Sequence, residues 1–292
     1  MYYAITGAGG SLGKLVLADL IKLVPADNII AATRHPELLA DYAAMGVSVR
    51  YANFNDPSGL PEAFSGAERL LIISTGNYEE IYAGKRILQH KAAIGAALEA
   101  GVSHISYTSA PNASMANTED RIIRDHAQTE EVLSSSGADW TALRNNMYME
   151  GVSYFLSAFR TGENILVPES SIGKPCWVLR EDCARTAAYV LSGKSVFKGA
   201  AEVTGPEAID LAGLAARWSD FSGGKLKVRV IPEKDVVNCI VAKGMTQEAA
   251  RGLIESATVF WRLFDVPVSD TVLRATGTQP ASVDEMLRGL DI

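Results

Sequence analysis

Glycines near the N-terminus have a spacing that suits contact between the backbone and a phosphate. Gly7, Gly10 and Gly13 lie three residues apart, and Gly9 precedes the middle one. Because glycine has no side chain, such a turn lets a pyrophosphate approach backbone N–H groups, and its last glycine lets a helix pack closely on a strand. The spacing, G-x-x-G-x-x-G, differs from the common G-x-G-x-x-G of dinucleotide-binding enzymes. An ordinary strand-to-helix turn is the alternative.

The residues after these glycines have the spacing of an amphipathic helix. Leu12, Val16, Leu20 and Leu23 fall on one face, and a short apolar run from residue 1 predicts a buried strand before the turn. Ser11 and Leu12 lie in the first turn of this helix. We include both in the predicted phosphate site, because the free N–H groups at a helix N-terminus attract anions.

A second chemical signal is the basic residue that follows the predicted second strand. In a sheet that binds NAD, an acidic residue at this place usually accepts a hydrogen bond from the ribose 2′-hydroxyl. Here the strand ends in Thr33, and Arg34 follows. A guanidinium can bind a 2′-phosphate with two hydrogen bonds, whereas a carboxylate would repel it. The sequence therefore predicts NADP(H) in preference to NAD(H), and an arginine that stacks on adenine is the alternative.

These residues need a sheet that brings the ends of separate strands together, and the chain has the pattern for one. Short apolar runs that predict strands cover residues 28–33, 47–51, 70–73, 103–108 and 140–143, and helical patterns cover 81–100 and 119–135. Strands that alternate with helices in this way are typical of an α/β fold with a parallel, doubly wound sheet.

Ligands of such sheets lie at the carboxyl ends of the strands, so the residues that follow each strand are candidate cofactor contacts. Besides the glycine turn and Arg34, these candidates are Asn53, Phe54, Ser74, Thr75, Gly76, Thr108, Ser109 and Asn145. For Ser109, a side chain that caps a helix or a turn is the alternative.

Beyond residue 150 the pattern is less regular. Helices are expected over residues 180–190, 211–221 and most of 235–264, and strands over 201–204 and 227–231. We predict a nucleotide-binding domain in residues 1–150. Residues 151–292 are predicted to form a smaller substrate-side lobe, interleaved with the last strands of the sheet.

Composition limits the partners of the chain. Its 292 residues are 48% hydrophobic and 21% charged, with a formal net charge of −7. This acidic balance argues against nucleic-acid binding, which needs clustered Lys and Arg. Cys176, Cys183 and Cys239 lack a metal-ligand spacing, so neither a disulfide framework nor a metal site is suggested. Without a membrane-spanning run or a signal peptide, we expect a cytoplasmic protein that acts on a small molecule, as a monomer or a homodimer.

Several short motifs coincide with those of one known family. They are the turn from Gly7 to Gly13, residues 97–109, the run His126-Ala-Gln-Thr-Glu with Ser136-Gly137 after it, Leu143-Arg-Asn, and Val203-Thr-Gly-Pro. On these motifs the chain resembles the NmrA-like branch of the short-chain dehydrogenase/reductase superfamily. Within that branch it is most similar to NADPH-dependent quinone reductases and to reductases of triphenylmethane and azo dyes. The resemblance covers nearly the whole chain and implies a Rossmann-type fold, a nicotinamide cofactor and a variable C-terminal lobe over the substrate.

The resemblance also bears on the contact with adenine. Relatives commonly carry an aspartate and then an aromatic residue after the third strand, whereas this chain has Asn53 and Phe54. Packing of adenine on the Phe54 ring survives this change, but a contact made by the acid does not carry over.

The usual catalytic pair of the superfamily, Tyr-x-x-x-Lys, is missing, because none of the ten tyrosines has a lysine four residues later. His126 stands near the expected place and could reach a ribose hydroxyl or the nicotinamide; a solvated helix histidine is the alternative. Asn145 and Tyr148 follow the sixth strand and are expected beside the nicotinamide, with Tyr148 facing the substrate or else packed in the core. Tyr148 and His126 are the candidate catalytic residues.

The missing pair indicates the chemistry. Carbonyl reduction develops an alkoxide that needs a placed proton donor, whereas quinones, cationic dyes and azo groups accept hydride readily and take protons from water. We therefore predict an NADPH-dependent reductase that transfers hydride directly to an electron-poor aromatic acceptor. Trp177, Phe155, Phe260 and Trp261 are candidate pocket walls that also suit a core. The alternatives are a non-catalytic NADP(H)-sensing regulatory protein of the NmrA type, and an isomerase or epimerase.

Overall fold

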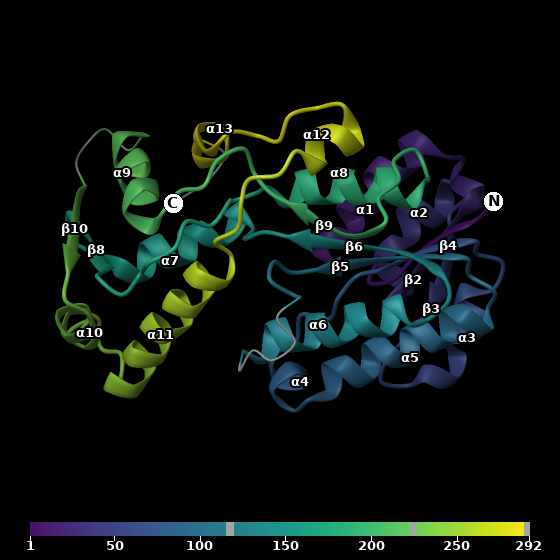
Figure 1. Cartoon of the computed structure of the whole chain (residues 1–292), viewed down its shortest axis with the longest axis horizontal. Helices are drawn as coiled ribbons and strands as arrows, with labels where there is room; N and C mark the ends of the chain where they lie inside the picture. The colour runs from purple at the N-terminus through teal and green to yellow at the C-terminus, as the bar shows by residue number, and fades with distance from the viewer. Residues whose placement is uncertain (115–119, 222, 224–225, 289–292) are drawn as a thin grey trace. The chain divides into compact units, whose positions relative to one another are not determined.

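The computed structural model describes residues 1–114, 120–221, 223 and 226–288, and these residues form two compact units (Figure 1). The first unit comprises the described residues of Met1–Asn145 together with Arg180–Val203 and Asp270–Thr278. The second unit comprises the described residues of the three remaining segments, which begin at Asn146, Thr204 and Gln279. Two segments beyond the predicted boundary at residue 150 therefore belong to the first unit.

A parallel sheet forms the centre of the first unit, with its seven strands in the order β3-β2-β1-β4-β5-β6-β9 (Figure 1). The first six of these follow the strand order 3-2-1-4-5-6 of the Rossmann fold, so the predicted fold class is confirmed. The strands are β1 (Tyr3–Ile5), β2 (Ile29–Thr33), β3 (Ser48–Tyr51), β4 (Arg69–Ile72), β5 (His104–Ser109), β6 (Asp139–Asn145) and β9 (Gly199–Val203).

The central strands are buried on both faces, which explains why they were visible as nearly continuous apolar runs. Ala4 of β1 pairs with Ile30 of β2 on one side and with Leu70 of β4 on the other. All three side chains are buried, and they belong to a core that also includes Ile105 and Tyr107 of β5.

Helices cover both faces of this sheet (Figure 1). On one face α1 (Ser11–Leu23) packs on α8 (Arg180–Leu191), which also contacts α12 (Thr271–Thr276), and on the other α5 (Lys85–Glu99) packs on α3 (Leu60–Phe64) and α6 (Arg121–Ser134). The shorter elements are η1 (Ala26–Asn28), η2 (Pro36–Leu39), α2 (Ala40–Ala44), η3 (Pro57–Gly59) and α4 (Tyr78–Tyr82).

The helix predicted over residues 81–100 is interrupted, and this is the main local difference from the sequence prediction in the first unit. Helix α4 ends at Tyr82, and α5 starts at Lys85. Gly84 between them has a φ of +72°, a left-handed conformation that glycine adopts without steric cost. The break makes α4 and α5 two separate helices.

The second unit has a small sheet in the order β10-β8-β7 and a helical layer. Its strands are β7 (Arg160–Thr161), β8 (Asn164–Pro168) and β10 (Lys227–Ile231), and its helical elements are η4 (Met149–Gly151), α7 (Val152–Phe159), α9 (Leu211–Phe221), α10 (Glu233–Val241), α11 (Gln247–Leu263) and α13 (Val283–Arg288). The stretch predicted as mostly helical over residues 235–264 is divided between α10 and α11, with Gly244 at a φ of +100° in the turn.

Aromatic and aliphatic side chains form the core of the second unit. Trp177 and Trp261 are fully buried, and their rings meet edge to face with centroids 5.8 Å apart. Leu156, Ile165 and Leu214 belong to the same core. Within the described part of the chain, no helix is both long enough and apolar enough to cross a membrane.

Candidate functional site

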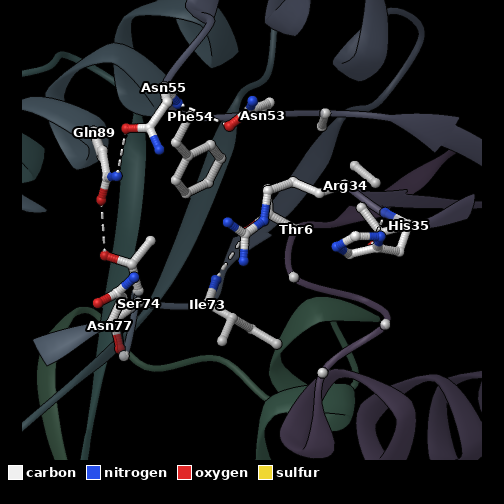
Figure 2. A pocket seen from close by; sticks show the side chains of 18 of the residues that line it. Thr6, Arg34, His35, Asn53, Phe54, Asn55, Ile73, Ser74, Asn77 and Gln89 are labelled. Atoms are coloured by element: carbon white, nitrogen blue, oxygen red, sulfur yellow. Dashed lines mark hydrogen bonds between the residues drawn. The ribbon is translucent and has the colours of Figure 1, made fainter. Parts of the chain in front are cut away.

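A cleft in the first unit opens at the carboxyl ends of β1, β2, β3 and β4, where ligands of open α/β sheets lie (Figure 2). Its volume is about 330 Å³. The predicted cofactor contacts that line it are Gly7, Gly9, Gly10, Arg34, Asn53, Phe54, Ser74, Thr75 and Gly76. Predicted residues from four separate strand ends are thus brought together around one cavity.

The glycine turn is packed so closely that side chains would not fit at its end. Gly7 has a φ of +62°, and the backbone N–H of Gly10 donates to the carbonyl of Gly7 at 3.0 Å. A Cβ at Gly13 would lie 2.3 Å from the Gly7 carbonyl oxygen and 2.7 Å from the Cα of Ala8. Gly13 does not line the cleft, and neither do Ser11 and Leu12. Gly13 instead lets α1 start directly against the turn, so that the helix N-terminus is available for an anion.

Arg34 and Phe54 give the cleft a positive charge and an aromatic surface. Arg34 comes directly after β2 and extends into the cleft, and the Phe54 ring comes from the segment after β3 (Figure 2). A guanidinium suits a phosphate, and an aromatic ring suits a nucleobase. The cleft therefore has the groups for a phosphorylated adenosine.

One wall of the cleft is a polar network whose helix residues the sequence prediction missed. The Thr75 hydroxyl donates to Gln89 Oε1 at 3.0 Å, and Gln89 Nε2 donates to Asn55 Oδ1 at 2.9 Å and Glu80 Oε2 at 3.0 Å. Asn55 Nδ2 donates to Glu80 Oε1 at 2.8 Å. The hydrogen bonds from Gln89 and Asn55 lower the pKa of the Glu80 carboxyl, and the charge of Arg34 lowers it further. Glu80 thus places a negative charge in the cleft that also contains the positive charge of Arg34.

Sequence periodicity gave no signal for the helix residues of this network. Glu80 lies on α4 and Gln89 on α5, and both line the cleft. A polar residue on a helix is usually solvated, and the sequence alone does not tell which helix residues face a cleft. Gly84 lies between Glu80 and Gln89 in the chain, and a glycine that interrupts a helical pattern is the one sequence signal near them.

Thr108 lies behind the cleft wall. The Ser74 backbone N–H donates to Thr108 Oγ1 at 2.8 Å, and Thr108 Oγ1 is 3.2 Å from Ser74 Oγ. Thr108 is buried and does not line the cleft. It therefore supports the segment after β4 from the neighbouring strand.

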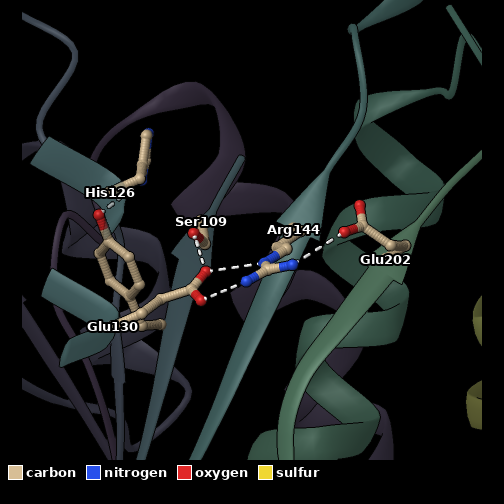
Figure 3. Close-up of polar contacts among 6 residues, drawn as sticks. Ser109, His126, Glu130, Arg144 and Glu202 are labelled. Carbon is tan, nitrogen blue, oxygen red and sulfur yellow. Dashed lines mark hydrogen bonds and ion pairs between the residues drawn. The ribbon is translucent and has the colours of Figure 1, made fainter. Parts of the chain in front are cut away.

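Ser109 belongs to a buried ionic network (Figure 3). Its hydroxyl donates to Glu130 Oε1 at 2.6 Å. Glu130 also accepts from Arg144, with Nε to Oε1 at 3.0 Å and Nη2 to Oε2 at 2.7 Å, and Arg144 Nη1 lies 3.2 Å from Glu202 Oε1. The hydrogen bond to Glu130 raises the pKa of the Arg144 guanidinium, while burial raises that of the Glu202 carboxyl. The network joins α6 to the carboxyl ends of β5, β6 and β9.

His126 is buried, so the alternative of a solvated helix histidine is wrong. Its Nδ1 is 2.7 Å from the Tyr107 hydroxyl, and its Nε2 accepts a hydrogen bond from the Arg86 guanidinium. Burial holds the pKa of His126 well below its usual value, and the nearby Arg86 lowers it further. His126 does not line the cleft, and its two ring nitrogens already have partners within the protein. This arrangement leaves no ring nitrogen for a ribose hydroxyl.

The remaining predicted site residues lie at and beyond the end of β6. Asn145 is the last residue of β6 and is buried, and Tyr148 lies in the second unit, where it bridges to Val178. Of the four candidate aromatic walls, Trp177 and Trp261 form the core of the second unit. The side chains of Phe155 and Phe260 lie outside the described residues.

The doubly wound sheet and the glycine-lined cleft at its strand ends define a dinucleotide-binding protein of the Rossmann type. The chain belongs to the NmrA-like family, whose sequence pattern matches residues 3–286. The predicted resemblance is confirmed.

A similar sequence and two similar solved structures indicate the class of activity. Quinone oxidoreductase 2 of Escherichia coli is 35% identical over 254 residues, which cover 87% of this chain and 86% of that protein. The solved NADPH complex of the NADPH-dependent quinone oxidoreductase from Escherichia coli superposes with a TM-score of 0.83, at 31% identity and 98% coverage of both chains. The triphenylmethane reductase of Citrobacter sp., solved with NADP(H), gives a TM-score of 0.82 at 28% identity, again covering 98% of both chains. The predicted enzyme class, an NAD(P)H-dependent oxidoreductase, is confirmed.

Proposed function

We propose that the cleft binds NADP(H) and that the protein transfers hydride directly to an electron-poor aromatic acceptor, namely a quinone, a triphenylmethane dye or an azo dye. The observation that carries the cofactor choice is Arg34, which extends into the cleft from the end of β2, where NAD-binding sheets carry an acid. The acceptor class is supported by the similarity to a quinone oxidoreductase and a triphenylmethane reductase.

The residues present fit such a cofactor. The turn closed by Gly13 and the N-terminus of α1 suit a pyrophosphate, because α1 begins after Gly10 without a side-chain cap and the first N–H groups of a helix have no partner within it. Arg34 suits the 2′-phosphate, and Phe54 suits the adenine ring. The ionised Glu80 lies on the same wall as Gln89, so it can accept a hydrogen bond from an amino group of the base.

We assign no side chain as a proton donor to the substrate, and the proposed chemistry needs none. A bound NADPH supplies the hydride, and the chain binds and orients it. The hydroxyl of Ser109 and the ring of His126 are both held in buried hydrogen bonds, so neither is assigned as a proton donor. A carbocationic dye needs only the hydride, and a quinone needs the hydride and one proton, which water supplies. Asn145 and Tyr148 are proposed as neighbours of the nicotinamide and of the substrate, with positioning as their contribution.

A turnover assay tests this proposal. The purified protein should oxidise NADPH in the presence of a naphthoquinone, a triphenylmethane dye or an azo dye. With deuterium at C4 of NADPH, the label should appear at the central carbon of the reduced triphenylmethane dye. Tyr148→Phe should retain turnover to within about 100-fold, because general acid–base groups typically contribute about 10²–10⁴-fold.

Two outcomes would contradict the proposal. Tight NADPH binding without turnover of any acceptor would favour the NADP(H)-sensing regulator. A loss of more than about 10⁴-fold in Tyr148→Phe, with NADPH binding intact, would reveal a dedicated proton donor and return the protein to carbonyl reduction.

A further inference from the structure

His90, which the proposed chemistry does not use, contacts the cofactor cleft from behind. It lies on α5, its side chain is fully buried, and its Nε2 is 3.2 Å from the backbone nitrogen of Thr75. A backbone N–H can only donate, so Nε2 must be the acceptor. The proton of the neutral ring is therefore on Nδ1.

The other side of the ring meets groups that suit this tautomer. His90 Nδ1 is 3.0 Å from Thr129 Oγ1 and 3.3 Å from the Tyr107 hydroxyl. The Thr129 hydroxyl already donates to the Asp125 carbonyl at 2.7 Å, so its oxygen is free to accept from Nδ1. Both ring nitrogens of His90 thus have complementary partners.

The same reasoning assigns the tautomer of the second histidine behind the cleft, His126. A guanidinium cannot accept a hydrogen bond, so Nε2 of His126 accepts from Arg86, and Nδ1–H of His126 faces the Tyr107 hydroxyl. A buried chain of side chains therefore runs from Arg86 through His126 and Tyr107 to His90 and ends on Thr75 at the cleft. Burial lowers the pKa of His90 to about 3, with a further contribution from the charge of Arg86. The acceptor at Thr75 therefore persists at neutral pH.

Thr75 is held twice by adjacent residues of α5. Its backbone N–H donates to His90, and its hydroxyl donates to Gln89. Ser74, Thr75 and Gly76 line the cleft together. The position of this wall is set by α5, since the backbone N–H and the hydroxyl of Thr75 are both bound there.

We propose that His90 is a positioning residue for the cofactor: its Nε2 fixes the backbone of Thr75, and with it the segment of Ser74–Gly76 that lines the cleft. This rests on the proposed binding of NADP(H) in the cleft. Without the acceptor, the Thr75 N–H must find another partner, because an unsatisfied donor beside a buried side chain is costly. The segment then moves out of the arrangement that the cofactor needs.

Three substitutions separate the effect of the hydrogen bond from that of the bulk of the ring. His90→Leu fills the site without an acceptor and should raise the Kd for NADPH about tenfold, with the KM for NADPH rising more than kcat falls. His90→Gln can place an amide oxygen near the position of Nε2 and should restore most of the affinity. His90→Asn is shorter, and its amide should not reach Thr75.

His104→Leu is the matched control. His104 is also a buried histidine of the first unit, but its Nε2 lies 3.4 Å from Thr141 Oγ1, and it does not line the cleft. This variant should lower the melting temperature and leave the Kd for NADPH unchanged. Equal losses of affinity in His90→Leu and His104→Leu would overturn the inference, because they would mean general destabilisation.

Three further outcomes would contradict either the role of His90 or the proposed function. Wild-type affinity in folded His90→Leu, or equal affinity of His90→Gln and His90→Asn, contradicts the role of Nε2; the second comparison applies even if the leucine variant does not fold. Failure of the unmutated protein to bind NADPH would instead contradict the proposed function, on which the inference rests.

Discussion

The two units of the protein bury different chemistry. The first unit holds all four histidines of the chain, and three of them, His90, His104 and His126, are buried in polar surroundings. The second unit holds no histidine, and its core is built from aliphatic side chains and buried tryptophans such as Trp177 and Trp261. Buried polar groups must be hydrogen-bonded, whereas an apolar core needs only shape and volume.

This difference shows where the protein needs fixed positions. In the first unit the buried networks lie behind or beside the strand ends that form the cleft, and they hold Thr75 and Ser74 from the neighbouring elements. A hydrogen-bonded network specifies one arrangement more strictly than packing does. The first unit should therefore respond sharply to single substitutions of its buried polar residues, and the second unit should respond mildly to substitutions of its polar residues.

The largest effect on cofactor binding is expected at Gly13. A single Cβ there meets the Gly7 carbonyl oxygen at 2.3 Å, so Gly13→Ala should abolish NADPH binding or prevent folding of the first unit. Gly95→Ala, in the middle of α5, is the control: a Cβ at Gly95 meets nothing within 4 Å, and alanine is favoured over glycine in a helix by roughly 0.5–1 kcal/mol. Calorimetric titration and thermal unfolding measure both. Full NADPH affinity in folded Gly13→Ala would remove the basis of the cleft assignment.

The next largest effect is expected at Arg144. Arg144→Met leaves the buried Glu130 and the partly buried Glu202 without their shared cation and should lower the free energy of unfolding by about 3 kcal/mol. In the second unit Arg217 pairs with Glu207 through two hydrogen bonds of 2.7 Å, but the two side chains are 38% and 34% exposed. Arg217→Met should therefore cost less than about 1 kcal/mol. Chemical denaturation that gives equal losses for the two variants would break the contrast between the units.

A smaller effect is expected on cofactor choice. Unmutated protein should bind NADPH more tightly than NADH, and Arg34→Ala should remove most of the difference, roughly 1.5–3 kcal/mol, because a charge-assisted hydrogen bond to the 2′-phosphate is lost. Affinity for NADH should change little, which serves as the internal control. Equal affinities of the unmutated protein for the two cofactors would contradict the role of Arg34.

The smallest effect is expected for one histidine in the pH dependence of stability. Burial lowers the pKa of His104 to about 4 in the folded protein, so between about pH 4 and 6.5 the unfolded chain binds a proton that the folded chain does not. Stability therefore falls as the pH falls through this window. His104→Leu should reduce the slope of unfolding free energy against pH by up to about 1.4 kcal/mol per pH unit. An unchanged slope would show that His104 is protonated in the folded state.

The pH series also separates the two units. Trp177, Trp218 and Trp261 are buried in the second unit, whereas Trp140 lies on β6 of the first. In a Trp140→Phe variant, tryptophan fluorescence therefore reports on a region without histidine. Amide exchange in β5 should lose protection on acidification before this fluorescence changes. Coincident transitions at every pH would mean that the units unfold together.

Local sequence patterns determined the α/β class, most element positions, the glycine turn, and the strand-end residues Arg34 and Phe54. These features depend on neighbouring residues: apolar runs form buried strands, and a residue that follows a strand of a parallel sheet lies at its ligand-binding edge. The tertiary structure alone decided which polar side chains face the cleft. Gln89 and His90 are adjacent on α5, yet Gln89 lines the cleft and His90 is buried behind it.

Ser109 and His126 also show what the sequence could not predict, because both were candidate site residues and the structure gives their polar atoms other partners. Both have residue types that could do chemistry, and both stand where the sequence suggests a site, but Glu130 and Tyr107 occupy their polar atoms. A hydrogen bond between side chains depends on the register of β5 and α6 against each other, to within a fraction of an ångström. Periodicity and spacing carry no information at that scale, so the sequence named these residues and the packing of distant segments assigned their partners.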